Sequence, residues 1–257
     1  RKMVLAIDIG NTSVTVGGFA GDELRFAQRL TTDAEKGQTG YEAELRTLLQ
    51  QNGCAAEMEG VVVSSVVPQA ECCLVPALQA VTGTRPLVVT PDLDLGLEIK
   101  GYDTASLGRD RMVDAVAALH FYQPPIALFD LGTATTLSVL DEQGRFCGGA
   151  IAAGVQMGLC ALHTRTAQLP EIQLSKPASV VGNNTEECLR SGAVIGAAAL
   201  VDGFSKRVEQ ELGCPVRTVV TGGAARWVLP WCQREVAHRE HLLLEGLYLI
   251  YQRCVIK

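Results

Sequence analysis

One short pattern occurs twice in the chain, and it constrains the fold more than any other feature. Residues 4–12 are a β-rich apolar run that ends in Asp8 and continues into glycine and a hydroxyl residue. Residues 126–133 repeat this layout around Asp130, 122 positions further along and close to half of the 257 residues. A matched pair at half-chain spacing indicates that one domain has been duplicated.

Each copy leads into a second apolar run, at 14–19 and at 136–140. Apolar runs separated by a Gly, Asn or Thr turn predict a β-hairpin. The Pro124-Pro125 pair just before the second copy is typical of a boundary. We therefore expect two domains, over residues 1–123 and 124–257.

Segments of helical and strand character alternate around the hairpins. The spacing of apolar residues predicts helices over 41–51, 72–81, 191–212 and 242–251, and a further helix from about residue 108. Short apolar runs predict strands over 61–63, 87–89 and 216–221. This alternation, with a hairpin at each start, indicates an α/β protein with mixed sheets.

Composition excludes several classes of partner. The chain carries 28 acidic and 22 basic residues, a net charge of -6, without clustered Lys and Arg, so we expect no nucleic-acid binding. The longest apolar stretch, 193–201, is far shorter than the roughly 20 residues that span a bilayer. The nine cysteines are an odd number without CxxC spacing, which disfavours a disulfide framework. We expect a cytoplasmic protein with reduced cysteines and no membrane segment.

A strand that delivers Asp into a glycine turn has a chemical use. Its carboxylate can hold Mg²⁺ directly or through water, and glycine lets backbone N–H groups approach phosphate oxygens. Asn11, Thr12 and Thr133 add side-chain donors. The alternative is that these residues only build turns. Neither GxxxxGK[ST] nor GxGxxG after a strand occurs, which disfavours a P-loop kinase and a dinucleotide-binding domain.

The two copies are more specific than this pattern alone. Residues 8–12 and 130–136 resemble the two phosphate motifs of the actin/hexokinase/Hsp70-like ATPase superfamily, and more narrowly those of type III pantothenate kinases. Residues 108–111 match that family's Gly-x-Asp-Arg. Further matches, in the family's order, lie at 148–151, 166–170, 182–185, 221–223 and 244–247. The resemblance covers nearly the whole chain.

This resemblance implies an α/β fold of two related actin-like (ribonuclease H-like) domains, with mixed sheets and a nucleotide cleft between them. It implies transfer of the ATP γ-phosphoryl group to the hydroxyl of pantothenate, which gives 4'-phosphopantothenate and opens coenzyme A biosynthesis. ATP would bind with Mg²⁺ and with a monovalent cation, K⁺ or NH₄⁺. The family also implies a homodimer with the pantothenate pocket near the subunit interface.

The resemblance also assigns residues to roles. Those implied in ATP binding are Asp8, Gly10, Asn11, Thr12, Ser13, Thr15, Thr133, Gly222 and Gly223. Asp8 would help to hold Mg²⁺, and Asp130 matches the ligand of the monovalent cation. Those implied in pantothenate binding are Tyr102, Gly108, Arg109, Arg111 and Thr185. Asp110 matches the proposed catalytic base.

The Asp110-Arg111 pair suits this chemistry on its own terms. An Asp, with a reference pKa of about 3.9, is a weak base toward an alcohol, so Asp110 would orient the hydroxyl and take its proton late. Arg111 can pair with a substrate carboxylate, which pantothenate has and sugars lack. The alternative is a helix-start Asp beside a solvated Arg.

The sequence leaves two alternative functions open, and it differs from the family's pattern at one position. The rivals are a sugar or polyol kinase of the same superfamily and a non-catalytic regulatory or accessory protein of the same fold. The family usually has Pro-Gly after its Gly-Gly-x-Ile segment, whereas this chain has Ala153-Gly154. Loss of the proline frees φ at residue 153 and is expected to loosen that loop.

Overall fold

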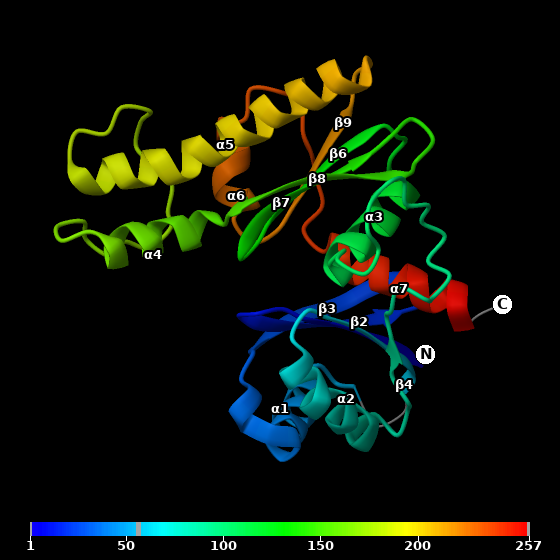
Figure 1. The fold of residues 1–257 in the computed structure, drawn as a ribbon. Helices are drawn as coiled ribbons and strands as arrows, with labels where there is room; N and C mark the ends of the chain where they lie inside the picture. The colour runs from blue at the N-terminus through cyan, green and yellow to red at the C-terminus, as the bar shows by residue number, and fades with distance from the viewer. Residues whose placement is uncertain (1, 55–57, 256–257) are drawn as a thin grey trace. The chain divides into compact units, whose positions relative to one another are not determined.

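The computed structural model describes residues 2–54 and 58–255, and the chain divides into two compact units (Figure 1). Among the described residues, unit 1 comprises 2–54, 58–97, 103–117 and 241–255, and unit 2 comprises 98–102 and 118–240. Helix α3 (Arg109–Phe121) starts in unit 1 and ends in unit 2. The domain boundary expected at 123/124 stays a prediction, although the last helix belongs to unit 1 by its contacts.

Unit 1 is built on a five-stranded sheet in the order β3-β2-β1-β4-β5. Its strands are β1 (Met3–Ile9), β2 (Ser13–Ala20), β3 (Glu23–Thr31), β4 (Met58–Ser65) and β5 (Leu87–Val88). Its helices are η1 (Ala34–Lys36), α1 (Gly37–Gln51), α2 (Pro68–Thr82) and α7 (Leu242–Val255). Helices α1 and α2 cover one face of the sheet, and α7 packs on β1 and β4 from the other face (Figure 1).

Side-chain alternation along the central strand explains this layering. Leu5, Ile7 and Ile9 of β1 belong to the same buried cluster as the apolar faces of α1 and α2. On the other face, glycine lets α7 approach the sheet, because a Cβ at Gly60 would overlap the ring of Tyr251. Strand β1, in which all residues but Met3 and Asp8 are buried, therefore has apolar neighbours on both faces.

Unit 2 repeats the arrangement with the order β10-β9-β6-β7-β8. Its strands are β6 (Ile126–Leu131), β7 (Ala134–Leu140), β8 (Phe146–Ala153), β9 (Arg217–Thr221) and β10 (Ala237–His238). Its helices are α4 (Val155–Arg165), α5 (Thr185–Leu212), α6 (Ala225–Val228) and η2 (Leu229–Trp231). In each sheet the first three strands along the chain form an antiparallel meander. The other two strands add in parallel on the opposite side of the first strand.

The register of the two sheets matches as well as their order. Asp8 pairs with Thr15 on the antiparallel side and with Ser64 on the parallel side. Asp130 pairs with Thr136 and Thr221 in the same two directions. Both units thus present an Asp between two hydroxyl residues at the carboxyl end of the first strand. The expected α/β fold of two related units with mixed sheets is confirmed.

Helix α5 is the longest element of unit 2. Asn184 caps its start by accepting a hydrogen bond from the Glu187 N–H. Residues Val194, Ala198 and Val201 follow a spacing of three and four, and they pack onto the core beside β6. On length and composition alone, α5 is the one helix among the described residues that qualifies as a membrane span, a test that core helices of soluble proteins also pass.

Candidate active site

The first phosphate loop joins β1 to β2. The Gly10 N–H donates to the Ser13 carbonyl oxygen at 3.0 Å, which closes a tight turn. Thr32 holds the loop from the side, because its hydroxyl donates to the Gly10 carbonyl oxygen at 2.7 Å. Asn11 and Thr12 are exposed at the tip. The predicted donors therefore stand at the carboxyl end of a buried strand, where a phosphate can reach them.

The second loop surrounds the Asp130 carboxylate with glycine. A Cβ at Gly132 would lie 3.3 Å from both carboxylate oxygens. A Cβ at Gly222 would overlap Asp130 Oδ1 and the backbone of Leu131, and Gly222 has a φ of 95°. Asp130, Gly132 and Gly222 thus form a cradle that side chains would fill. The structure brings the predicted cation ligand and the predicted adenosine-binding glycine into contact.

The turn from β8 into α4 packs directly on this second loop. A Cβ at Gly154 would overlap the carbonyl oxygens of Gly132 and Thr133. Gly154 has ordinary extended angles, φ -63° and ψ 155°, so glycine is needed here for space and not for conformation. Ala153, which replaces the family's usual proline, still pairs with Ala134 at the end of the ladder.

Replacing Gly154 by alanine should destabilise the protein by about 1–3 kcal/mol, because the added methyl group must displace backbone in the phosphate loop. Gly158, one turn into α4, would have nothing within 4 Å of an added Cβ, and Gly158→Ala should be neutral or stabilising by about 0.5–1 kcal/mol. Denaturant unfolding of both variants checks this. Equal free energies of unfolding for the two would contradict the close approach.

The start of α3 carries the Gly-x-Asp-Arg residues. Asp110 Oδ1 accepts a hydrogen bond from the Arg111 N–H at 2.9 Å, so the carboxylate folds back over the helix start. A Cβ at Gly108 would come within 2.5 Å of the same oxygen. Arg111 is only 6% exposed, so the alternative of a solvated arginine does not hold.

Arg109 has a partner that the sequence did not indicate. Its guanidinium forms an ion pair with Glu71 Oε2 of α2 at 3.0 Å, and both side chains are largely shielded from solvent. The pair ties the start of α3 to α2 within unit 1. The role of Arg109 in binding pantothenate stays a prediction.

Tyr102 and Thr185 lie outside these two loops. The Tyr102 ring meets the edge of Phe146, with centroids 5.5 Å apart and planes at 89°. Thr185 is the exposed first residue of α5. It lines an open groove of about 580 Å³ with Gln168, Pro170, Asn184, Glu186, Glu187 and Arg190. Arg190 is held there by Glu186 and Glu187.

Comparison with known proteins decides between the candidate functions. The sequence profile of type III pantothenate kinases matches residues 4–207. A protein of Exiguobacterium sp. (strain ATCC BAA-1283 / AT1b) named type III pantothenate kinase is 38% identical over 252 residues, which cover 98% of this chain and 99% of the relative. The chain belongs to the type III pantothenate kinase family. Its activity is ATP-dependent phosphorylation of pantothenate.

Solved structures of low identity share the fold of this kinase. A ROK family glucokinase from Streptomyces griseus, in complex with glucose and AMPPNP, is 12% identical with a TM-score of 0.54, over 96% of this chain and 97% of that chain. The ethanolamine utilization protein EutJ from Carboxydothermus hydrogenoformans is 14% identical with a TM-score of 0.54, over 97% and 89%. At these identities the likeness shows the fold alone.

The predicted site residues of the kinase fall into separate groups. The loop from Asp8 to Thr15 and the start of α3 belong to unit 1, whereas Asp130, Gly222, Tyr102 and Thr185 belong to unit 2. That all of them act on one pair of bound substrates stays a prediction. Within the described residues, no three His, Cys, Asp or Glu side chains gather into a metal site. The sequence did not indicate the contact of Glu71 with Arg109. It also did not indicate the contacts of Phe146 and Gly148 with Tyr102.

Proposed function

We propose that this pantothenate kinase uses Asp110 to orient the substrate hydroxyl and Arg111 to bind the substrate carboxylate. Asp110 at the start of α3, beside an arginine that is 6% exposed, is the observation that carries the proposal. The planar guanidinium of an arginine offers paired N–H donors that match the two oxygens of a carboxylate. Pantothenate offers such a carboxylate at the end opposite its primary hydroxyl.

The proposed transfer is a direct displacement at the γ-phosphorus of ATP. The hydroxyl oxygen of pantothenate forms a bond to the γ-phosphorus, the bond from that phosphorus to the β,γ-bridging oxygen breaks, and ADP leaves. The hydroxyl proton passes to the Asp110 carboxylate late in the step. Because this transition state is loose, holding the hydroxyl in line contributes more than removing its proton early.

On the ATP side, the glycine turns suit a polyphosphate. We assign Asp8, Gly10, Asn11, Thr12, Ser13, Thr15 and Thr133 to the phosphates, and Gly222 and Gly223 to the adenosine. Glycine suits both loops, because a Cβ would come within 3.2 Å of the Ser13 carbonyl oxygen at Gly10 and within 3.3 Å of the Asp130 carboxylate at Gly132. Glycine turns of this kind present backbone N–H groups to phosphate oxygens. The Asp8 carboxylate, at the end of β1, is a hard oxygen donor of the kind Mg²⁺ prefers. Bound Mg²⁺ would neutralise charge on the transferring phosphoryl group.

Asp130 is proposed as the ligand of a monovalent cation, K⁺ or NH₄⁺. Its carboxylate packs against Gly132 and Gly222, where a Cβ would come within 3.3 Å of its oxygens and would overlap Oδ1, respectively, so glycine at both positions permits this placement. A weakly hydrated cation between this carboxylate and a phosphate would offset the repulsion between the two anions.

A homodimer is proposed because several large apolar side chains between residues 151 and 181 of unit 2 are exposed. Ile151 of β8 is 67% exposed, Met157 and Leu162 of α4 are 46% and 44% exposed, and Val181 is 82% exposed. Helices α4 and α5 pack on one another and project together from the sheet (Figure 1). An isologous contact between two copies of the chain would remove such side chains from water. We expect a dimer by sedimentation at micromolar concentration, and a monomer there would contradict the proposal.

A coupled ADP-release assay tests the function. With ATP, Mg²⁺, K⁺ and pantothenate we expect turnover, and with glucose or another polyol in place of pantothenate we expect none. Turnover with glucose alone would favour a sugar kinase, and no turnover with any acceptor would favour a regulatory protein.

Replacing K⁺ by Na⁺ in the same assay should lower the rate. An unchanged rate in Na⁺ would reject only the cation role of Asp130. We also propose a cytoplasmic location.

A further inference from the structure

Residues 98–102 extend the sheet of unit 2 at its edge strand β8. The Phe146 N–H donates to the Glu98 carbonyl oxygen, and the Lys100 N–H donates to the Phe146 carbonyl oxygen, both at 2.8 Å. Ile99 and Phe146 form an isolated parallel bridge. We call residues 98–102 the strap. Its backbone is hydrogen-bonded to both the N–H and the carbonyl group of one residue of β8, Phe146. Tyr102 is the last residue of the strap.

The same residue of β8 also meets the Tyr102 ring. Phe146 is fully buried, and its ring lies edge-to-face with Tyr102 at 5.5 Å between centroids. A Cβ at Gly148 would lie 3.5 Å from Tyr102 Cδ2. A β-bulge separates these two contacts, because Leu140 pairs with Phe146 and Val139 with Gly148, which leaves Cys147 as the extra residue. β-bulges are over-represented at sheet edges and next to active sites, where they can re-aim a side chain.

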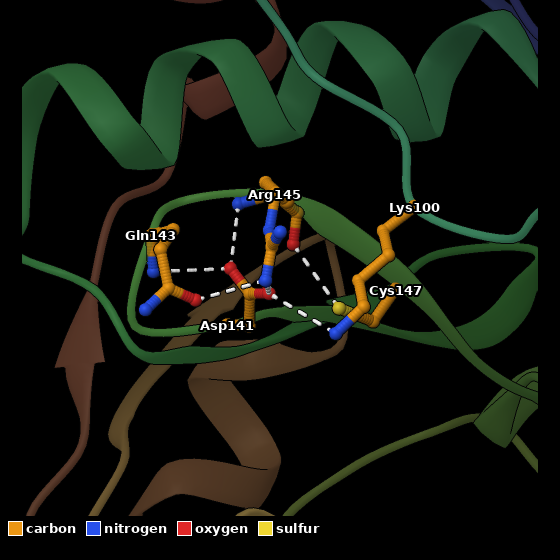
Figure 2. A network of polar contacts seen from close by, with 5 residues as sticks. All are labelled: Lys100, Asp141, Gln143, Arg145 and Cys147. Carbon is orange, nitrogen blue, oxygen red and sulfur yellow. Dashed lines mark hydrogen bonds and ion pairs between the residues drawn. The ribbon is translucent and has the colours of Figure 1, made fainter.

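A polar network beside the strap fixes the turn between β7 and β8 (Figure 2). Asp141 Oδ1 accepts from the N–H groups of Gln143 and Arg145 at 3.0 and 2.9 Å, and Oδ2 accepts from Arg145 Nε at 2.9 Å. Burial alone would raise the pKa of the Asp141 carboxyl, but these hydrogen bonds and the Arg145 charge hold it at about 2. Lys100 of the strap reaches the same carboxylate, with 3.9 Å from Nζ to Oδ2.

We propose that Phe146 is a positioning residue for pantothenate, which it serves by holding the strap and the ring plane of Tyr102. The inference rests on the proposed function, in which Tyr102 lies in the pantothenate pocket. Phe146 acts only through Tyr102 and does not touch the substrate. Replacing the Phe146 ring should therefore weaken the binding of pantothenate without changing the binding of ATP.

The variant Phe146→Leu tests this, because leucine keeps the backbone pairing and most of the buried apolar surface. An edge-to-face aromatic pair contributes about 0.5–1.5 kcal/mol beyond its burial, so KM for pantothenate should rise about 2- to 12-fold. KM for ATP and kcat should stay within about twofold. Equal changes in KM for both substrates, or a fall in kcat alone, would overturn the inference.

A double-mutant cycle with Tyr102→Leu separates positioning from a general structural role. In the Tyr102→Leu background, Phe146→Leu should leave KM for pantothenate within about twofold, because the contact is already lost. An effect as large as in the wild-type background would overturn the inference. If Phe146→Leu does not fold, Phe146→Met provides the same cycle with a longer apolar side chain.

Lys100→Met is the matched control on the strap itself. The Lys100 side chain is 58% exposed, its Nζ lies 3.9 Å from Asp141 Oδ2, and Asp141 keeps its ion pair with Arg145 when Lys100 is replaced. An ion pair with such an exposed partner contributes little, so KM for pantothenate should change less than about twofold. A rise as large as that of Phe146→Leu would assign the effect to strap anchoring and not to the ring. Absence of pantothenate-dependent turnover in the wild-type protein would count against the proposed function instead.

Discussion

Replacing Asp110 by asparagine should lower kcat by a factor of about 10² to 10⁴, the range expected for loss of a positioned proton acceptor. The amide oxygen can still accept the hydrogen bond that the Arg111 N–H donates to Oδ1 at 2.9 Å, so the start of α3 should keep its geometry. The amide cannot take the proton of the pantothenate hydroxyl. Steady-state kinetics should therefore show the loss in kcat, with KM for ATP within about twofold.

A matched control for Asp110→Asn lies in the same unit. Asp33 also uses Oδ1 to accept a backbone N–H at short range, from Glu35 at 2.9 Å, and it lies outside the Gly-x-Asp-Arg segment. Asp33→Asn should leave kcat unchanged, and both variants should unfold near the wild-type temperature. Wild-type kcat in Asp110→Asn would remove its catalytic role.

Replacing Gly222 by alanine should destabilise the protein by about 3 kcal/mol or more and raise KM for ATP at least about tenfold. Two costs combine at this position: the positive φ of 95° disfavours any L side chain, and the added Cβ would overlap Asp130 Oδ1 and Leu131. The loop could accept the methyl group only by moving the Asp130 carboxylate out of its cradle. Denaturant unfolding and ATP titration of the kinetics measure the two effects.

Gly213 separates the two costs. It ends α5 with a φ of 76° in open space, with nothing within 4 Å of a Cβ. Gly213→Ala should therefore cost only about 1–2 kcal/mol from backbone strain and leave KM for ATP unchanged. Equal losses in the free energy of unfolding for Gly222→Ala and Gly213→Ala would mean that the close packing of Gly222 on Asp130 adds no cost to the backbone strain.

The duplication could be predicted from the sequence because its signal is local. A buried strand ends in Asp8 or Asp130, a glycine turn follows, and each hairpin forms as expected. The structure extends the repeat to strand order and to the hydroxyl neighbours of both carboxylates. Those neighbours on the parallel side come from distant strands, so no local pattern indicates them.

Helix starts were predicted less well than helix cores. Helix α5 begins at Thr185 and not at residue 191, and α2 begins at Pro68 and not at residue 72. The spacing of apolar residues gives no signal in a polar first turn, where the residue at which the helix begins is set by its N-terminal cap. Asn184 provides that cap in α5, and Pro68 occupies the first turn of α2.

Contacts between distant segments could not be read from the sequence. Glu71 pairs with Arg109 across 38 positions, and no spacing rule joins them. A Cβ at Gly246 of α7 would overlap the Val113 carbonyl oxygen of α3, which explains the need for glycine there. For the same reason α3 is buried on more faces than the expected apolar stripe, Arg111 and Asp114 included.

Mass spectrometry of the product tests whether this kinase phosphorylates pantothenate and recognises its carboxylate. The protein is incubated with ATP, Mg²⁺ and K⁺, and with either pantothenate or pantothenol, in which a hydroxyl replaces the carboxylate. We expect pantothenate to gain one phosphoryl group, in equal amount to the ADP formed. Pantothenol should react far more slowly, because it lacks the carboxylate that Arg111 is proposed to bind. ADP formation without phosphorylated pantothenate, or equal rates for the two acceptors, would contradict this expectation.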